Sequence, residues 1–479
     1  MRIVLADPPA PAWNTYMRYS PNLGLLYLAG YLRRRVPDIG ICYVDANQSV
    51  DQHLKTVARQ KPSIYGLSFA SPLSAVVKPL LRRVREVIPE ALIVCGGAHP
   101  TADPLAVLKG SPTDICCLGE GEATFAELVE EFLGHGELAT VGGIAYKHAE
   151  GEVAYTASRP PIRDLDSIPF PAWDLVDLRK FWGLRYAKSW PCAEVVASRG
   201  CAFNCTFCAD PVWRGTTPRV RRRSPEKIAE EVDLLYHRGV REVFIRAAHM
   251  NDNLDWAIKV FEALHALDHP DLYFQCNLRL EHITPGLAGS MRRAGCWSCN
   301  IGLESGSQRV LDGIKKKIVL YEAGAQLRTL KDHGIKVFAF LMLYQIWELD
   351  QGLQIETTRE VFQSLLYVLS LRAKKLVNQM SWSFATPYPG SDLYRICEKF
   401  GLLPHNWDQS LISLSDRMTI SIPNLSKLEI VTARVAGLFI QGLLNLSNRE
   451  RYQCHTIGPN LKHGLMKLRH LLGVFAQSK

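Results

Sequence analysis

Arg199-Gly200-Cys201-Ala202-Phe203-Asn204-Cys205-Thr206-Phe207-Cys208 places three cysteines at the spacing C-x-x-x-C-x-x-C. Three thiolates on one short loop can hold three irons of a 4Fe–4S cube and leave the fourth iron without a protein ligand. Such an open iron can bind a substrate or cofactor directly, whereas a cluster that only carries electrons is normally closed by a fourth cysteine. The spacing therefore predicts a catalytic iron–sulfur site at Cys201, Cys205 and Cys208.

A structural zinc site is the alternative for these three cysteines. Zinc sites of that kind use four ligands and usually pair two C-x-x-C knuckles, but the neighbouring sequence offers no second knuckle of matching spacing. The chain has 13 cysteines in 479 residues, so a chance match to the spacing is expected only about one time in a hundred. We therefore favour the iron–sulfur interpretation.

The cysteine loop resembles that of the radical S-adenosylmethionine (radical SAM) superfamily, which reads C-x-x-x-C-x-Φ-C, and Phe207 fills the aromatic position. The resemblance implies that the open iron chelates the amino and carboxylate groups of S-adenosylmethionine. One electron, from an external donor such as flavodoxin or ferredoxin, would then release a 5′-deoxyadenosyl radical. It also implies that Phe207, and Glu304 and Ser305 in the later run Gly302–Ser307, bind S-adenosylmethionine. A helix-capping turn is the alternative for Glu304.

The composition limits the class of protein. A chain of 479 residues is expected to form two or three domains, and 47% hydrophobic and 22% charged residues are typical of a folded soluble protein. We find no apolar run long enough to cross a bilayer, and Asp7 and two prolines interrupt the start too early for a signal peptide. Scattered cysteines, odd in number, fit a reducing compartment. We therefore expect a cytoplasmic protein without a membrane span.

The net charge of +9 is modest for this length, and its densest patch is Arg219-Val220-Arg221-Arg222-Arg223. Nucleic-acid surfaces combine such patches with interleaved aromatic residues, which are missing here. We therefore expect a solvated loop, or a surface that faces an anionic cofactor, and no nucleic-acid partner.

Residues 1–135 alternate short apolar runs with amphipathic stretches, the pattern of βα units around a parallel sheet. Four of the five expected strands end in turn-rich loops, and ligands of open α/β sheets bind at these carboxyl ends. An NAD-binding Rossmann domain is disfavoured because no G-x-G-x-x-G follows the first strand. The expected strands are Arg2–Ala6, Ile39–Val44, Ile64–Phe69, Ala91–Gly96 and Asp114–Leu118, and the expected helices are Leu23–Arg35, Leu80–Val87 and Thr124–Phe132.

This half resembles the Rossmann-like cobalamin-binding domain that precedes the barrel in one large radical SAM subfamily. The matching pieces are Asp7-Pro8-Pro9 followed by Pro21–Ala29, then Gly96–Thr101, then Gly119–Glu122. A hydrogen-bonded loop histidine is the alternative for His99. The resemblance implies that cobalamin is bound by Pro8, Ser71, Gly96, Gly97, His99, Gly119, Glu120 and Gly121.

Other cobalamin proteins place a histidine on cobalt with D-x-H-x-x-G after the first strand, but the first-strand loop of this chain has no histidine. We therefore expect cobalamin bound base-off, without a histidine ligand on cobalt. The run Asp51-Gln52-His53 follows the second strand and lacks the glycine, so we expect it to begin an ordinary helix.

Residues 136–190 are expected to form a hairpin, Gly143–Lys147 with Glu152–Thr156, and then a proline-rich linker. Residues 191–400 predict a partial (βα)6 barrel of the TIM type, with the cysteine loop at the carboxyl end of its first strand. Residues 401–479 predict a helical extension, most clearly at Val431–Leu446. The six barrel strands are expected at Glu194–Ser198, Glu242–Arg246, Leu272–Asn277, Trp297–Gly302, Lys336–Met342 and Gln379–Phe384.

Two loops of the predicted barrel depart from the subfamily pattern. Relatives carry acidic residues or Gly-Gly-Glu after the second strand, where this chain has Arg246–Asp252, and Asp252 or His249 are the candidates to replace them. After the fifth strand, Leu343–Glu348 stands in place of a G-x-P-G-E-T turn. Both departures put in doubt how S-adenosylmethionine is positioned, and they indicate a specialised substrate.

Two further pairs of cysteines invite a redox interpretation. Cys296 and Cys299 are three residues apart at a strand, where their side chains are expected to face opposite sides. We therefore expect buried, unpaired thiols there. Cys116 and Cys117 also lie on an expected strand and are interpreted as core residues.

The resemblance implies a cobalamin-dependent radical SAM enzyme, and methyl transfer to an unactivated carbon of a small-molecule substrate is the commonest activity of such relatives. Radical oxidation, cyclisation or rearrangement with the same cofactors is one alternative. A cofactor-binding partner protein without turnover is another. The expected cofactors are a 4Fe–4S cluster, S-adenosylmethionine and cobalamin.

Overall fold

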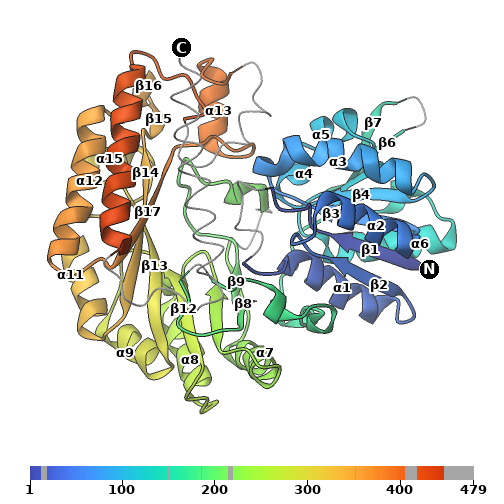
Figure 1. Cartoon of the computed structure of the whole chain (residues 1–479), viewed down its shortest axis with the longest axis horizontal. Coiled ribbons are helices and arrows are strands. Elements are labelled where there is room, and N and C mark those ends of the chain that lie inside the picture. Colours follow the sequence, from blue (N-terminus) through green and yellow to red (C-terminus); the bar gives the residue numbers. More distant parts are fainter. Residues whose placement is uncertain are drawn as a thin grey trace.

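The chain forms two α/β units that lie side by side in a computed structural model (Figure 1). The structure describes residues 1–11, 19–148, 151–184, 186–213, 219–350, 352–404 and 418–446. The N-terminal unit and the barrel that follows it are each built on one mainly parallel sheet. The expected α/β architecture is therefore confirmed.

The N-terminal sheet has seven strands in the order β2-β1-β3-β4-β5-β6-β7, and its first five strands are parallel. All five expected strands are confirmed, with small shifts at their ends. The expected hairpin is also confirmed as β6 and β7, and it extends this sheet through antiparallel pairing with β5. The strands are β1 (Arg2–Ala6), β2 (Gly40–Val44), β3 (Ile64–Ser68), β4 (Leu92–Gly96), β5 (Ile115–Cys117), β6 (Ile144–Lys147) and β7 (Val153–Tyr155).

Helices cover both faces of the N-terminal sheet, because alternate residues of each strand point to opposite sides. Ile3 and Leu5 of β1 pack in one core and Val4 and Ala6 in the other. The helices are α1 (Leu23–Arg35), α2 (Val50–Gln60), α3 (Ser74–Val87), α4 (Ala98–Ala102), α5 (Pro104–Gly110) and α6 (Gly121–Gly134).

Helix α2 shows that Asp51-Gln52-His53 begins an ordinary helix, as expected. Ser49 caps α2 in a reciprocal capping box with Gln52. The His53 side chain is buried, and its Nε2 lies 2.8 Å from the Tyr65 hydroxyl. His53 therefore belongs to the core of the N-terminal unit.

The barrel sheet has six parallel strands in the order β17-β14-β13-β12-β11-β8, so β8 and β17 are its edges and the barrel is open, as expected. The strands are β8 (Cys192–Val196), β11 (Glu242–Arg246), β12 (Tyr273–Leu278), β13 (Cys296–Glu304), β14 (Lys336–Leu343) and β17 (Gln379–Phe384). The helices are α7 (Pro225–His237), α8 (Leu254–His265), α9 (Pro285–Arg293), α10 (Gln308–Gly313), α11 (Leu320–Asp332), α12 (Thr358–Ala373), α13 (Asp392–Lys399) and α15 (Lys427–Leu446). Two small antiparallel pairs of strands complete the barrel unit. One is β9 (Ser198–Arg199) with β10 (Arg221–Arg222), which flank the cysteine loop, and the other is the hairpin β15 (Ile346–Leu349) with β16 (Gly352–Ile355).

Hydrogen bonds close the amino-terminal end of the barrel around Glu242. Its carboxylate accepts from the Trp297 indole at 2.9 Å and from the Gln275 amide at 2.5 Å. Burial raises the pKa of Glu242 to about 6. The carboxyl ends of the strands therefore remain as the reactive end of the barrel.

Cys296 and Cys299 are both fully buried, which confirms the expectation of core thiols. The argument that they face opposite sides of the strand is wrong. Phe274 of β12 pairs with Cys296, but the next residue pairs with Ser298, so Trp297 is an extra residue in a β-bulge. The bulge turns both thiols into the same core. Cys116 and Cys117 are buried as well.

Helix α15 packs on β17 and α12 at the outside of the barrel (Figure 1). Gly437 allows this approach, because a side chain there would collide with the Trp382 ring. By length and composition, Lys427–Asn445 could cross a membrane, and no other described helix could. The expectation that no apolar run has this length is therefore wrong. Residues 405–417 and 447–479 of the expected helical extension lie outside the described residues.

Candidate active site

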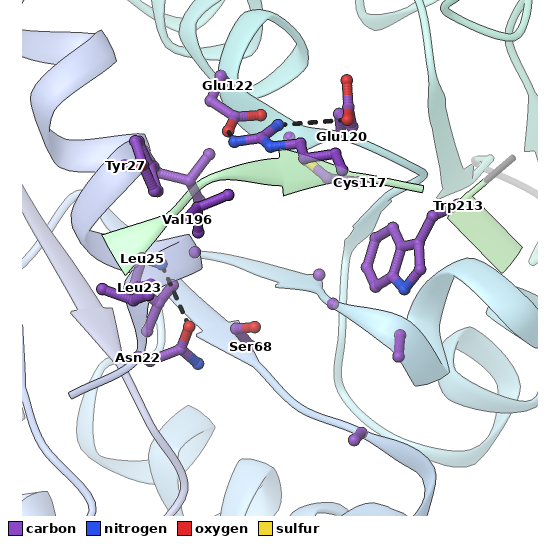
Figure 2. Close-up of a pocket in the computed structure, with 18 of the residues that line it drawn as sticks. Asn22, Leu23, Leu25, Tyr27, Ser68, Cys117, Glu120, Glu122, Val196 and Trp213 are labelled. Atoms are coloured by element: carbon purple, nitrogen blue, oxygen red, sulfur yellow. Dashed lines mark hydrogen bonds and ion pairs between the residues drawn. The ribbon is translucent and has the colours of Figure 1, made fainter. Parts of the chain in front are cut away.

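A cavity of about 800 Å³ lies between the N-terminal unit and the barrel (Figure 2). Tyr27, Ser68 and Cys117 of the N-terminal unit line one side, and Val196 and Trp213 of the barrel unit line another. The cavity also reaches Gly200, the residue before Cys201. The carboxyl ends of the two sheets, where ligands of α/β folds bind, therefore open into one space.

Glycine backbone shapes the wall that the N-terminal unit contributes. Gly119 has a φ of +72°, and no atom lies within 4 Å of the place a Cβ would take, so its backbone faces open space. Gly97 has a φ of +96°, and a Cβ there would lie 2.8 Å from the Phe69 carbonyl oxygen. The loops after β3 and β4 thus pack backbone to backbone. Such a wall fits a large, flat ligand such as cobalamin, which backbone can approach closely.

Asp7 supplies a buried polar group at the edge of this wall. Its carboxylate accepts hydrogen bonds from the Tyr43 hydroxyl at 2.5 Å and the Asn22 amide at 2.8 Å. Burial raises the pKa of Asp7 to about 6, although both hydrogen bonds act against this shift. Asn22 also caps α1 by accepting from the Leu25 backbone N–H, the dashed line at Asn22 in Figure 2.

The structure separates the residues predicted to bind cobalamin into two groups. Gly96, Gly97 and the run Gly119-Glu120-Gly121 line the cavity. Pro8, Ser71 and His99 are not among the residues that line it.

His99 is 1% exposed and its Nδ1 lies 3.1 Å from the Ser71 hydroxyl. Its ring also packs on Phe69, with the ring centres 5.6 Å apart. This geometry matches the alternative of a hydrogen-bonded loop histidine. No described residue that lines the cavity is a histidine.

Glu120 joins the two units and the linker between them. It pairs with Arg199 at 3.3 Å and Arg221 at 2.8 Å, both from the barrel unit, and accepts from the Ile162 backbone N–H at 2.8 Å. Arg199 also pairs with Glu122. In Figure 2, dashed lines mark the ion pairs made by the labelled Glu120 and Glu122. Burial alone would raise the pKa of Glu120, but Arg221 and Arg199 lower it overall. The Gly119–Glu122 run therefore fixes the domain arrangement as well as the cavity wall.

For the basic run Arg219–Arg223 we expected either a solvated loop or a surface that faces an anionic cofactor; Arg219 is exposed, whereas Arg221 lines the cavity. Arg221 and Arg223 are only 5% and 4% exposed. Arg221 pairs with Glu120 and Arg223 pairs with Glu231 at 2.5 Å, so their charges are balanced inside the protein. Sequence pattern alone could not identify acidic partners that lie on other elements.

The cysteine loop begins immediately after β9. Gly200 has a φ of +84°, and any Cβ would collide with the Arg219 carbonyl oxygen, so only glycine fits. The Phe203 N–H points to Cys201 Sγ at 3.5 Å and the Asp210 N–H to Cys208 Sγ at 3.4 Å. Hydrogen bonds to sulfur stabilise the thiolates that hold an iron–sulfur cluster. The donor set and its half-buried position therefore fit a 4Fe–4S cube.

Two buried polar atoms beside the cysteine loop have no partner among the described residues, His249 Nε2 and Arg279 Nη2. The Arg279 guanidinium lies 3.6 Å from the centre of the Phe203 ring, and the His249 ring lies 5.3 Å from it. Burial lowers the pKa of His249; the charge of Asp252 opposes this shift, and the charges of Arg279 and Lys316 act with it. The Arg279 N–H, and the His249 N–H in the tautomer that carries its proton on Nε2, would suit the carboxylate of S-adenosylmethionine beside a cluster held by the three cysteines.

Arg279 was missed in the sequence, although it directly follows β12. The rule that barrel strands carry reactive groups at their carboxyl ends could have found it. Of the two candidates to replace the missing acidic residues, His249 lies beside the cysteine loop, whereas Asp252 pairs with Arg222 at 2.6 Å.

Glu304 and Ser305 occupy different environments. Glu304 is 7% exposed, has a φ of +61° and pairs with Lys316 at 2.8 Å. The Lys316 ammonium lies 5.8 Å from the centre of the Phe207 ring, which places this ion pair beside the cysteine loop. Ser305 is completely buried and hydrogen-bonds to Glu356 and Ser364. This geometry argues against a direct cofactor contact for Ser305.

Comparisons with known families identify both units. Residues 14–129 match the family described as B12 binding domain, and residues 195–350 match the family described as Radical SAM superfamily. The chain is a radical SAM enzyme with a B12-binding domain. The cofactors of such an enzyme are cobalamin, a 4Fe–4S cluster and S-adenosylmethionine, as expected.

The B12-binding radical SAM chain is similar to an uncharacterised methyltransferase of Pyrococcus horikoshii, 28% identical over 85% of each chain. It is also 29% identical to the anaerobic magnesium-protoporphyrin IX monomethyl ester cyclase of Rubrivivax gelatinosus, over 78% of this chain and 66% of that one. Among solved structures, the radical S-adenosylmethionine methyltransferase TsrM of Kitasatospora setae has the same fold. Its TM-score is 0.67 at 15% identity, over 83% of this chain and 75% of that one.

Proposed function

We propose that the protein is a cobalamin-dependent methyltransferase that acts on an unactivated carbon of a small molecule. The observation that carries this proposal is the cavity between the two units, which the cobalamin-type wall lines and which reaches Gly200 and Asp210 on either side of the three cysteines. A methyl donor and a radical generator can serve one carbon only if both reach it in the same space. The methyltransferase relative of Pyrococcus horikoshii supports the same activity.

The residues beside the cysteine loop have separate roles in this proposal. Cys201, Cys205 and Cys208 hold the cluster, and Arg279 and His249 orient the methionyl end of S-adenosylmethionine. When bound, the cluster supplies the electron that cleaves S-adenosylmethionine, and cobalamin supplies the methyl group. An electron donor protein such as flavodoxin or ferredoxin is the expected partner, and a reducing cytoplasm the expected location.

The barrel side of the cavity is the proposed substrate wall. Arg246 at the end of β11 forms two hydrogen bonds to Glu194 of β8, at 2.6 and 2.8 Å, and Asn277 lies on the next strand. The Arg246 side chain remains 48% exposed to the cavity. A substrate that approaches this wall meets both a fixed positive and a fixed negative group. Arg246 stands where relatives carry acidic residues, which indicates that this wall is specialised in the present chain.

The proposal can be tested before the substrate is known. Anaerobic holoprotein is mixed with a reductant and S-adenosylmethionine that bears a labelled methyl group. We expect label on the bound cobalamin and slow release of 5′-deoxyadenosine. Exchange of Cys205 for alanine should stop deoxyadenosine release. Absence of label from cobalamin during continued deoxyadenosine release would overturn methyl transfer.

That last outcome would favour a second candidate function, a radical cyclisation or rearrangement with the same cofactors. The observation in its favour is the similarity to the Rubrivivax gelatinosus cyclase. Mass spectrometry separates the two functions, because a cyclised or rearranged product keeps the carbon count of its substrate.

A further inference from the structure

Three metal-ligating side chains meet on the barrel surface, away from the residues of the cavity. Asp233 and His237 lie in the last part of α7, and His269 lies in the loop between α8 and β12. One ligand atom from each lies within 4.8 Å of the other two. Neither the cofactors nor the proposed function uses these residues.

The spacing of the first two residues explains their convergence. Side chains four residues apart project from the same face of a helix, and His237 Nε2 lies 3.5 Å from Asp233 Oδ1. A ligand–ligand separation of about 3.4 Å follows from zinc–nitrogen distances of about 2.1 Å in a tetrahedral site. The pair on α7 already has that separation.

Contacts around Tyr236 hold the third residue in place. The His269 ring stacks on the Tyr236 ring, with centres 3.7 Å apart and planes inclined by 11°. The Tyr236 hydroxyl donates to Asp271 at 2.7 Å, and Arg241 pairs with Asp271 at 2.8 Å. The loop that carries His269 is therefore fastened to α7 on both sides of Pro270. His269 Nε2 lies 2.8 Å from Asp233 Oδ1, a hydrogen bond that a bound metal ion would replace as the two ligand atoms move slightly apart.

The position on the helix also favours a cation. Asp233 and His237 lie at the carboxyl end of α7, where the helix dipole is negative. The positive charge of Arg241 is balanced by Asp271. Two imidazoles and one carboxylate form a donor set suited to zinc and similar divalent transition metals, with a fourth position left for water.

We propose that Asp233, His237 and His269 form a divalent transition-metal site, best suited to Zn²⁺, that clamps α7 to the loop before β12. Arg279 directly follows β12, so a metal ion at this site would stiffen the strand that carries Arg279 to the S-adenosylmethionine site. The proposal does not depend on methyl transfer.

Zinc titration of the cluster-loaded, cobalamin-loaded protein tests the site, because the cluster then occupies Cys201, Cys205 and Cys208. Equilibrium dialysis with metal analysis should show one additional zinc per chain. The variants His237→Ala and His269→Ala should each weaken this binding at least about tenfold, a common loss for a perturbed metal site. Iron content should not change.

A matched control is His265→Ala, which removes an exposed histidine at the end of α8, one that precedes His269 in the sequence. This variant should bind zinc as the parent protein does. Zinc should raise the melting temperature of the parent and of His265→Ala but not that of His269→Ala. Absence of a saturable zinc, or equal zinc binding by the His269→Ala variant, would overturn the proposal and leave a hydrogen-bonded surface cluster.

Discussion

The cavity wall of the N-terminal unit and the barrel region beside the cysteine loop use opposite kinds of chemistry. The N-terminal wall presents glycine backbone and apolar side chains, and its carboxylates, Asp7, Glu120 and Glu122, are already hydrogen-bonded or ion-paired within the protein. The open space at Gly119 comes from a missing side chain. The barrel beside the cysteine loop instead presents His249, Arg279 and Lys316, whose polar atoms lie in a buried setting. We therefore expect the first region to select its ligand mainly by shape and the second mainly by charge.

This difference predicts that each side can be damaged without the other. A cobalamin ring system offers a large surface for van der Waals contact, so small changes in backbone shape matter most. The methionyl end of S-adenosylmethionine is small and charged, so individual hydrogen bonds matter most. The ion pairs of Glu120 with Arg199 and Arg221 hold the two sides together.

The largest effect is expected from the cysteine loop. Exchange of Cys205 for alanine should remove the cluster and abolish deoxyadenosine formation, because two thiolates cannot hold the cube with its open iron. Cobalamin binding should persist. Iron and sulfide analysis, together with the cobalamin spectrum of the same sample, measures both results.

A cysteine of the other unit provides the control for this loss. Cys42 lies on β2, is half-buried and is far from the cysteine loop in sequence. Its exchange for alanine should leave iron content and deoxyadenosine formation unchanged. Loss of cobalamin from the Cys205→Ala protein would contradict the independence of the two sides.

The next largest effect is expected from Arg279. A hydrogen bond to a charged group contributes about 1.5–3 kcal/mol, so Arg279→Met should weaken S-adenosylmethionine binding roughly ten- to a hundredfold. Calorimetric titration of the cluster-loaded protein gives the affinity. Arg33→Met, which removes an exposed arginine paired with Asp174, should bind as the parent does. Unchanged affinity in Arg279→Met would show that the side chain only packs on Phe203 and pairs with Glu281.

The sequence could predict those features of the site that depend on neighbouring residues in the chain. It could not predict those that depend on residues far apart in the sequence. The cysteine spacing and the Gly119–Glu122 run are local, so their places at strand ends were predictable. Arg199 and Glu122 are 77 positions apart, and Arg279 meets Phe203 from another strand. Such contacts depend on how whole elements pack. The β-bulge at Trp297 is also set by neighbouring strands, so strand periodicity misplaced Cys296 and Cys299.

A smaller effect is expected at Gly119. Gly119→Ala places a methyl group in the cavity and adds the cost of a positive φ, about 1 kcal/mol. We expect cobalamin affinity to fall roughly tenfold, or about 1.4 kcal/mol, with cluster content unchanged. Gly151→Ala is the matched control, because Gly151 has a φ of +80° and also no atom within 4 Å, but lies in the β6–β7 turn. If both variants lost cobalamin equally, the cause would be backbone strain at a positive φ. The shape of the cavity wall at Gly119 would then not explain the loss.

The last effect concerns stability rather than cofactor binding and lies in the support behind the charged side. Glu356 accepts hydrogen bonds from the Ser305 hydroxyl and the Gln345 N–H, both at 3.0 Å, and burial raises the pKa of Glu356 to about 8. An unfolded glutamate ionises near pH 4.5. Between these values the folded state keeps a proton that the unfolded state has lost, so rising pH lowers stability by about 1.4 kcal/mol per pH unit.

Glu356→Gln removes this titration and keeps a side chain of similar shape. Relative to the parent, the variant should therefore gain about 2 kcal/mol of stability between pH 6.0 and 7.5. Melting temperatures of the two proteins at both pH values measure the difference. Parallel profiles would mean that Glu356 is already ionised in the folded protein. The carboxylate would then add a negative charge behind Ser305, and the charged side of the cavity would be less positive than its exposed groups indicate.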